Sequence, residues 1–542
     1  MKYFKKIFFL ICCVLPLFLA GCKPVVTITA PANGDTFTVG ETITFDGQAT
    51  DPLHPNLADA AFVWTSDKDG EIGTGPSFAS SNLSEGEHTI TLTVTDPVGQ
   101  SGQSSVSITV GNGTTSTTTT PTTTTTIENA STTTTTGNTG TAGSLDTTFG
   151  TGGKVMTHIG VGDTNTAHAV AIQSDGKIVV AGDSSDGFAL ARYNTDGSID
   201  TTFGSGGTVV TSDPSGLTGY AMAIQSNGKI LVGGKSGVIF PTQFALARYN
   251  TDGSIDTTFG SGGIVKTSIN SLEEIRAIGI QSTGKIVVAG DSSVSGQVDI
   301  FVMRYTSTGV LDTTFGPAIK DGTIRIWLTS TGLSNTGDDH ARALKIQTDD
   351  KIVVAGRTQT SDFAVVRLTA DGELDTTFGP NLDGGVMTPI GTGTDYAYAL
   401  AIQTDGKIVV AGTSVTSNTF DNFAVVRYTS SGILDSTFGT GGNVTTEIVN
   451  ASAWGVGIQS DGKIVAVGRT SGTYYDFAIV RYTASGSLDT TFGTGGIVIT
   501  DVGGFGDHAY GIAFQTDGKF VVAGDALHNA PKTDFAIVRY NP

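Results

Sequence analysis

Seven large side chains recur in the second part of the chain, each five residues before a repeated glutamine. All seven are aromatic or cationic, and no copy of the repeat lacks one. They are His168, Tyr220, Arg276, Arg342, Tyr398, Trp454 and Tyr510. Aromatic faces and guanidinium groups stack on flat or ring-shaped ligands, of which sugar rings are the most natural partners. We therefore predict a ligand-binding ring of these residues; the alternative is that they only pack between neighbouring repeats.

Residue patterns for catalysis are sparse by comparison. The sequence contains no G-x-S-x-G elbow, H-E-x-x-H motif or phosphate-binding loop. Asp338-Asp339-His340 and Asp507-His508 could bind a metal or act as a base, but no partner residues accompany them at suitable spacing. We expect no catalytic residues, no metal and no cofactor. A lyase or hydrolase acting on extracellular glycan is the alternative, and contacts of His168, His340 and His508 with carboxylates would favour it.

The seven side chains belong to a repeat that occurs seven times. Its L-D-T-T-F-G part is located by its phenylalanine, at Phe149, Phe203, Phe259, Phe315, Phe378, Phe438 and Phe492. Its Q-x-x-G-K-I-V-V-A-G part begins at Gln173, Gln225, Gln281, Gln347, Gln403, Gln459 and Gln515. The phenylalanines are 54 to 63 residues apart. Self-similarity on this scale indicates a propeller, a solenoid or an array of supersecondary units.

Within one copy the apolar residues alternate with a period of two, which indicates strands. The run K-I-V-V-A-G at 177–182 is typical of a strand covered on both faces. Asp175-Gly176 and Asp196-Gly197 supply the positive φ angles of two hairpin turns. Each copy is therefore predicted to be a four-stranded antiparallel sheet, which is the blade of a β-propeller.

The two ends of the repeat region complement each other. The chain ends in Arg539-Tyr540-Asn541-Pro542, where the second hairpin turn of the last copy is due, and residues 144–150 resume the repeat at that same phase. We infer that residues 144–150 supply the fourth strand of the last blade, in a three-plus-one closure that leaves no free sheet edge. The prediction for residues 144–542 is an all-β, seven-bladed propeller.

Residues present in every copy are expected to build the blade, whereas variable positions are free to form a site. Each copy has an arginine in F-x-x-x-R-Y and an aspartate in L-D-T-T, represented by Arg192 and Asp200. These two are diagonal neighbours across a hairpin turn, close enough for an ion pair. We interpret them as structural, and the lysine after the first turn, such as Lys177, as a turn-edge charge.

The repeat resembles the delta-60 repeat family and, more loosely, NHL-type propeller repeats. Both have a D-G hairpin followed by a strand that leads to F-G. The resemblance covers about residues 144–542 and implies the propeller fold. It implies little about function, because propellers serve as enzymes, scaffolds and receptors.

The N-terminus has the pattern of an export signal. Lys2, Lys5 and Lys6 precede an apolar stretch at 7–19 that is too short to span a membrane. The stretch ends in L-A-G-C, which resembles a bacterial lipobox; this implies cleavage after residue 21 and lipidation of Cys22. The lysine at position 23, where aspartate favours inner-membrane retention, implies sorting to the outer membrane. The alternative is an ordinary signal peptide with an accidental cysteine.

Two further segments precede the repeats. Residues 22–111 contain alternating strands at sandwich spacing and resemble a PKD-like immunoglobulin-fold module, with Trp64 in its core. Residues 112–143 are rich in threonine and cannot bury apolar surface, so we expect a disordered linker.

The formal net charge of −20 makes nucleic acid an improbable partner, since phosphate backbones would be repelled. The parts together suggest a monomeric cell-envelope lipoprotein, anchored in the outer membrane through Cys22 and facing the periplasm or the outside. Its propeller would be a binding head for a glycan or a protein. The alternatives are the glycan-cleaving enzyme and a purely structural surface protein.

Overall fold

A computed structural model describes most of the chain, and the elements are β-strands without an α-helix among them. The described residues are 24–31, 35–50, 61–96, 101–111, 140–269, 271–294, 296–316, 322–326, 338–358, 362–415, 421–472, 474–529 and 532–542. Cys22, the signal segment and residues 112–139 lie outside these ranges. None of the described residues forms a helix of the length and apolarity needed to cross a membrane. The chain divides into two compact units, 1–133 and 134–542, which are described separately.

The first unit is a sandwich of two sheets. One sheet has the order β1-β3-β6 and the other β2-β8-β7-β4-β5. The strands are β1 (Val25–Ala30), β2 (Thr36–Thr38), β3 (Ile43–Thr50), β4 (Phe62–Ser66), β5 (Gly70–Thr74), β6 (Ser77–Ser80), β7 (Gly86–Thr95) and β8 (Ser101–Gly111). Trp64 is fully buried, donates from Nε1 to the carbonyl of Gly75 at 2.9 Å and contacts Phe45 edge-on. The predicted tryptophan core is therefore present.

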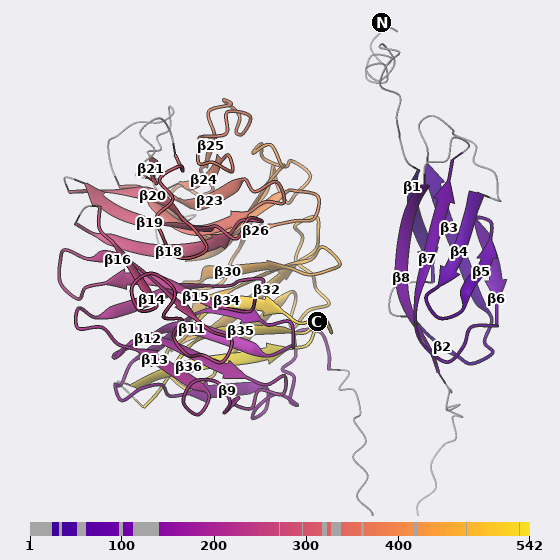
Figure 1. Cartoon of the computed structure of the whole chain (residues 1–542), viewed down its shortest axis with the longest axis horizontal. Coiled ribbons are helices and arrows are strands. Elements are labelled where there is room, and N and C mark those ends of the chain that lie inside the picture. Colours follow the sequence, from indigo (N-terminus) through magenta and orange to yellow (C-terminus); the bar gives the residue numbers. More distant parts are fainter. Residues whose placement is uncertain are drawn as a thin grey trace, which may run out of the picture. The chain divides into compact units, whose positions relative to one another are not determined.

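The second unit consists of seven four-stranded antiparallel sheets, as predicted (Figure 1). Their innermost strands are β10 (Asn165–Ile172), β14 (Leu217–Ile224), β18 (Glu273–Ile280), β22 (His340–Ile346), β26 (Asp395–Ile402), β30 (Ser452–Ile458) and β34 (Asp507–Phe514). The second strands are β11 (Ile178–Ser184), β15 (Ile230–Ser236), β19 (Ile286–Val294), β23 (Ile352–Arg357), β27 (Ile408–Val415), β31 (Ile464–Ser471) and β35 (Phe520–Asn529).

The outer two strands complete each blade. The third strands are β12 (Gly187–Tyr193), β16 (Gln243–Tyr249), β20 (Gln297–Tyr305), β24 (Phe363–Leu368), β28 (Asp421–Tyr428), β32 (Tyr475–Tyr482) and β36 (Lys532–Tyr540). The outermost strands are β13 (Thr208–Thr211), β17 (Ile264–Thr267), β21 (Thr323–Ile326), β25 (Gly385–Thr388), β29 (Asn443–Thr446), β33 (Ile497–Thr500) and, for the last blade, β9 (Lys154–Thr157). We number the blades 1 to 7 from β10 to β34.

Closure is of the three-plus-one type, but the closing strand lies further along the chain than predicted. β9 pairs with β36, whereas residues 144–150 contribute one bridge, Leu145 to Tyr540. The reason is that the L-D-T-T stretch winds into turns: Asp146 Oδ1 accepts from the backbone N–H and the hydroxyl of Thr148. The same displacement occurs in the other blades, whose outermost strands follow the F-G of the motif.

The invariant residues form one structural unit per blade. Arg192 Nε donates to Asp200 Oδ2 at 2.6 Å, and its guanidinium group lies 4.6 Å from the centroid of the Phe203 ring. Phe203 reaches the next blade, where a Cβ on Gly253 would lie 2.9 Å from the ring and φ is +86°. Lys177 is more than a turn-edge charge, because its Nζ also reaches Asp200 at 2.8 Å.

The hydrophobic cores lie between blades rather than within them. Seven buried clusters each combine residues from two neighbouring blades. One of them joins blade 7 to blade 1 and contains Val521, Ile537, Val180 and Phe149. Because every junction has such a core, the seven blades form a closed ring.

Candidate functional site

Each of the seven predicted site residues lies at a β-bulge in an innermost strand. In β10, for example, Ala167 pairs with Gly182 and Ala169 with Ala181, which leaves His168 as the extra residue. The same register shift occurs at the equivalent residue of the other six innermost strands. A bulge bends the strand and redirects its side chain. Local geometry therefore sets these seven side chains apart from the rest of each strand.

The seven side chains surround one cavity of about 210 Å³ at the centre of the propeller. They form a nearly continuous ring, which we call the mouth ring. Trp454 stacks on Tyr510 at 4.9 Å between centroids, and Tyr510 lies 5.0 Å from the His168 ring. His168 lies 5.4 Å from Tyr220, whose face is covered by the Arg276 guanidinium group at 4.1 Å. All seven residues are partly exposed, so they pack between blades and still offer surface to the cavity.

Arg276 and Arg342 share carboxylates on one side of the mouth ring. Asp291 is almost fully buried and accepts from Arg342 Nη1 at 2.8 Å, while Arg276 Nε lies 3.9 Å away. Arg276 also pairs with Glu274, which accepts from Lys235 at 2.6 Å. Burial alone raises the pKa of Asp291, but the His340 contact and the nearby arginines outweigh it and lower the pKa. Three cations thus share two carboxylates here.

A second set of side chains lies next to the mouth ring and was missed by the sequence prediction. We call it the outer ring; each member directly follows the glycine of the V-A-G, V-G-G or A-V-G sequence in a second strand. Its members are Asp183, Lys235, Asp291, Arg357, Thr413, Arg469 and Asp525. They pair across the sheet with the residue two positions before the mouth ring, as Asp183 does with Thr166. Their variation from copy to copy was the signal that could have identified them.

Three histidines contact carboxylates of the outer ring. His168 Nε2 lies 3.0 Å from Asp183, His340 Nδ1 lies 3.1 Å from Asp291, and His508 Nδ1 lies 3.2 Å from Asp525. Arg469 Nη1 donates to His508 Nε2 at 3.2 Å, so both nitrogens of that ring are engaged. By contrast, His168 Nδ1 and His340 Nε2 have no hydrogen bond within the described part of the chain. This co-location is the feature expected of the enzyme alternative.

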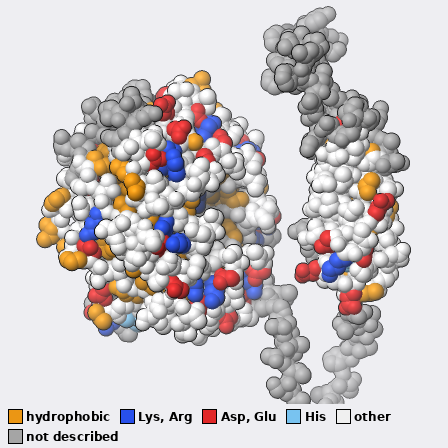
Figure 2. Space-filling model, in the orientation of Figure 1, with side chains coloured by type: hydrophobic (Ala, Val, Ile, Leu, Met, Phe, Trp, Pro, Cys, Tyr) orange, Lys and Arg blue, Asp and Glu red, His pale blue; other side chains and the backbone are white. Residues whose placement is uncertain are grey.

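Aromatic side chains extend from the mouth ring over blades 5 to 7. Tyr396 stacks on Tyr398 with centroids 5.9 Å apart, and Tyr475 lies 5.4 Å from His508. Tyr474 contacts Phe505 at 5.2 Å, and half of the Tyr474 surface is exposed. On the propeller face shown in Figure 2, acidic and basic side chains lie beside one another. Tyr398, Trp454 and Tyr510 give the channel mouth an aromatic side. Arg276 and Arg342 give it a charged side.

A group of three carboxylates lies beside His508. Oxygens of Asp476, Asp501 and Asp507 all lie within 4.8 Å of one another, an arrangement that could accept a cation. Sequence spacing did not reveal it, because Asp476 comes from blade 6 and Asp507 from blade 7. Burial raises the pKa of Asp507 to about 6; backbone N–H groups of Gly503 and Val502 oppose this shift, and the charges of Asp501 and Asp476 add to it.

Asp507→Asn is expected to raise the free energy of unfolding at pH 7, by up to about 3 kcal/mol. Because the folded-state pKa is raised above the ordinary value of 3.8, ionisation destabilises the fold, and stability falls as the pH rises from about 4 to 6. The asparagine carries no charge and keeps an oxygen for the Val502 and Gly503 N–H groups. Urea denaturation at pH 4 and pH 7 measures the effect.

Asp395→Asn is the matched control. Asp395 accepts from Ile390 and Gly391 as Asp507 does from its loop, but it belongs to no group of three acidic residues in the described ranges. The prediction would be contradicted if the free energy of unfolding of the Asp507→Asn protein differed between pH 4 and pH 7 by as much as that of the wild type.

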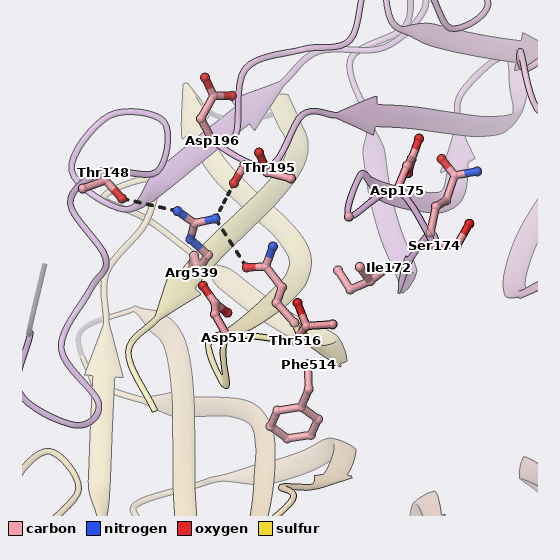
Figure 3. A pocket seen from close by; sticks show the side chains of 13 residues that line it. Thr148, Ile172, Ser174, Asp175, Thr195, Asp196, Phe514, Thr516, Asp517 and Arg539 are labelled. Atoms are coloured by element: carbon pink, nitrogen blue, oxygen red, sulfur yellow. Dashed lines mark hydrogen bonds between the residues drawn. The ribbon is translucent and has the colours of Figure 1, made fainter. Parts of the chain in front are cut away.

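A larger crevice of about 910 Å³ lies at the other end of the innermost strands, between blades 7 and 1 (Figure 3). Arg539 lies at its centre and donates to Thr148 Oγ1 at 3.4 Å and to Gln515 Oε1 at 3.3 Å. Turn residues such as Asp175 and Asp517 line it. All of these have counterparts in the other repeats, so the crevice is part of the blade junction rather than a distinct site.

Comparisons with known proteins agree with the repeat count. The family model described as "Domain of unknown function (DUF5122) beta-propeller" matches residues 173–203, 225–259, 281–315, 347–378, 403–438, 459–492 and 515–542. A bacterial Ig domain model matches residues 24–91. No curated protein matches the chain significantly.

Several solved structures are similar at low identity. The extracellular domain of the putative one component system BT4673 from B. thetaiotaomicron is 12% identical with a TM-score of 0.38, over 72% of this chain and 40% of that one. Polysaccharide lyase Uly1 is 12% identical with a TM-score of 0.42, over 69% and 90%. A protein from Dyadobacter fermentans is 11% identical with a TM-score of 0.37, over 71% and 98%. Such likenesses say nothing about activity, ligand or location.

The family matches begin at the seven glutamines that follow the innermost strands, one in each blade. The repeat region of this chain therefore belongs to the DUF5122 β-propeller family, the delta-60 repeat family, and its N-terminal unit contains a bacterial Ig domain.

Proposed function

We propose that the propeller is a carbohydrate-binding head of a cell-envelope lipoprotein. In this proposal Cys22 anchors the chain in the outer membrane, and the threonine-rich segment 112–143 connects the anchored part to the head. The mouth ring, formed by side chains that differ from repeat to repeat, is the observation that carries the proposal. A blade does not need variable aromatic residues around a cavity in order to fold, so these residues are free to bind a ligand.

The aromatic side of the mouth supports a sugar ligand in particular. Trp454 and Tyr510 are stacked, with an angle of 12° between their ring planes. Tyr396 and Tyr398 are also stacked, with an angle of 10°. Sugar rings have apolar C–H faces and polar edges, and they suit a surface of aromatic faces bordered by charged groups. Arg469 borders the stack, with its guanidinium group 4.7 Å from the Trp454 ring. Arg469 can therefore bond to hydroxyl groups beside the stacked ring.

Trp454→Ala is expected to weaken glycan binding by about 10-fold or more, because an aromatic anchor contributes about 1–2 kcal/mol or more to binding and 1.4 kcal/mol corresponds to a factor of ten. A glycan array with the full chain would identify the ligand, and calorimetry would give the affinities of wild type and variant.

Phe240→Ala serves as the control, since Phe240 is 68% exposed and makes no ring contact among the described residues. Equal loss of binding in both variants, or no loss in Trp454→Ala, would exclude the mouth ring as the site. Binding to a protein and to no glycan would replace the sugar with a protein partner.

A glycan-cleaving enzyme is the second candidate, favoured by the contact of His168 with Asp183 at 3.0 Å. In many enzymes a carboxylate orients a histidine ring, and the free nitrogen of that ring acts as the general base. Incubating the bound glycan with the wild-type protein and analysing its length decides between the two. Shortened chains that disappear with His168→Ala would establish the enzyme, and an intact glycan would favour the binding protein.

A further inference from the structure

Lys345 lies inside the central cavity and is the only charged side chain at its position in the repeat. The equivalent residues, three positions after the mouth ring, are Ala171, Ala223, Gly279, Ala401, Gly457 and Ala513. The lining of the cavity extends one residue deeper along β22 than along the other innermost strands, and that residue is Lys345. A blade does not require a lysine here, because six blades form with alanine or glycine.

The ammonium group of Lys345 has no hydrogen bond or ion pair with any residue that the structure describes. Its side chain is exposed to the cavity that it lines. The surrounding strands nevertheless remove much of the bulk solvent, and this burial lowers the pKa of Lys345. Buried or enclosed charges in proteins are ordinarily paired. An ammonium group that lines a cavity, is accessible from it and has no carboxylate partner among the described residues is therefore suited to an anion from outside the chain.

The residues above Lys345 add to the positive charge. Arg342, from the same strand, and Arg276 belong to the mouth ring, and Lys235 lies beside them. In the ion pairs of the described residues, these three cations share the carboxylates of Glu274 and Asp291. The charged side of the mouth therefore extends down to Lys345. Lys345 is the one cation without an ion-pair partner that we find among the described lining residues.

The size of the cavity restricts what can enter. Pockets for whole drug-sized ligands have about 300–1,000 Å³, and this cavity has about 210 Å³. A single substituent or one terminal residue of a chain fits better than an extended oligosaccharide, which would lie across the aromatic side outside.

We propose that Lys345 binds the anionic substituent of an acidic sugar, a carboxylate or a sulfate ester, while the aromatic residues of the mouth stack on the sugar rings. This inference rests on the proposed function and specifies its ligand class. The anion forms a charge-assisted hydrogen bond with the ammonium group, and a neutral sugar cannot replace that bond.

The test compares oligomers of galactose, galacturonate and sulfated galactose of matched length, by calorimetry with the full-length protein. We expect an acidic oligomer to bind about 10-fold or more tightly than the neutral one, as a hydrogen bond to a charged group implies. Lys345→Ala, which creates the residue found in four other blades, and Lys345→Met, which keeps the length, should remove that difference. Lys532→Ala, at an exposed lysine that begins β36, should keep it.

The two acidic oligomers distinguish a carboxylate from a sulfate ligand. A preference for acidic oligomers that persists in both Lys345 variants overturns the role of Lys345 and leaves the proposed function intact. Equal affinity of the wild-type protein for acidic and neutral oligomers also overturns the role of Lys345.

A direct measurement uses ¹⁵N-lysine-labelled protein, in which the Lys345 side-chain signal is followed during addition of formate or sulfate. If no oligomer binds but these ions shift that signal, the anion site is supported, whereas the sugar ligand and the proposed function fail together. If neither oligomers nor ions bind, the anion site is overturned.

Discussion

Acidification from pH 4 towards pH 2 is expected to unfold the propeller in one steep transition. Each blade contains a nearly buried arginine–aspartate pair with an N–O distance of 2.6 to 2.8 Å. Burial alone raises the pKa of these aspartates, but hydrogen bonds from threonine and the neighbouring arginine and lysine outweigh it. The resulting pKa is about 2 for Asp375, Asp435 and Asp489. It is also lowered for Asp146, Asp200, Asp256 and Asp312.

The direction follows from the difference between folded and unfolded states. A carboxyl group whose folded-state pKa is below its ordinary 3.8 stabilises the fold above that pH, and the contribution is lost as the pH falls towards the folded-state value. A shift of this size corresponds to about 2 kcal/mol for each group. Seven such contributions add up to about 14 kcal/mol, which is comparable with the stability of a typical domain, about 5–15 kcal/mol. Unfolding should therefore precede complete protonation.

Circular dichroism against pH, together with a proton-uptake titration, measures this transition. Asp435→Asn should shift the midpoint upwards, because one pair is lost at every pH. Asp405→Asn, at an exposed turn aspartate of the same blade, should leave it unchanged. A propeller that keeps its spectrum at pH 2 would show that the pairs contribute little to stability.

Asp146→Ala is expected to lower the free energy of unfolding of the propeller by about 3–5 kcal/mol, the cost of leaving a buried charge unpaired. Asp146 is fully buried and accepts from Arg539 Nε at 2.8 Å and Lys519 Nζ at 2.9 Å. Arg539 lies 393 residues further along the chain, so this pair joins the two ends of the propeller. Guanidinium denaturation measures the loss.

Asp435→Ala is the matched control for closure. It removes the same pair from Arg427, only 8 residues away within one blade. Both variants should lose similar stability, but only Asp146→Ala should make the segment around β9 sensitive to limited proteolysis. Cleavage that is equal in both variants would contradict the view that Asp146 holds the closing strand in place.

The sequence by itself determined the features that depend on neighbours along the chain. The alternation of apolar residues and the Asp196-Gly197 type of turn predict four strands per repeat, because hairpins are local structures. The ion pair of Arg192 with Asp200 follows from the same hairpin. The identity of the mouth ring was also predictable, since a fixed offset from the glutamine places one residue of each blade at the same height on its innermost strand.

Only the tertiary structure decided how these residues are used, because the contacts involved join different blades or depend on backbone irregularities. The bulge at His168 and its counterparts has no marker in the sequence. Asp476 and Asp507 meet across a blade boundary, and His340 reaches Asp291 in the preceding blade. Lys345 looks like any lysine on a strand until seven innermost strands enclose it. The tertiary structure is what places it in the lining of the central cavity, without a carboxylate partner among the described residues.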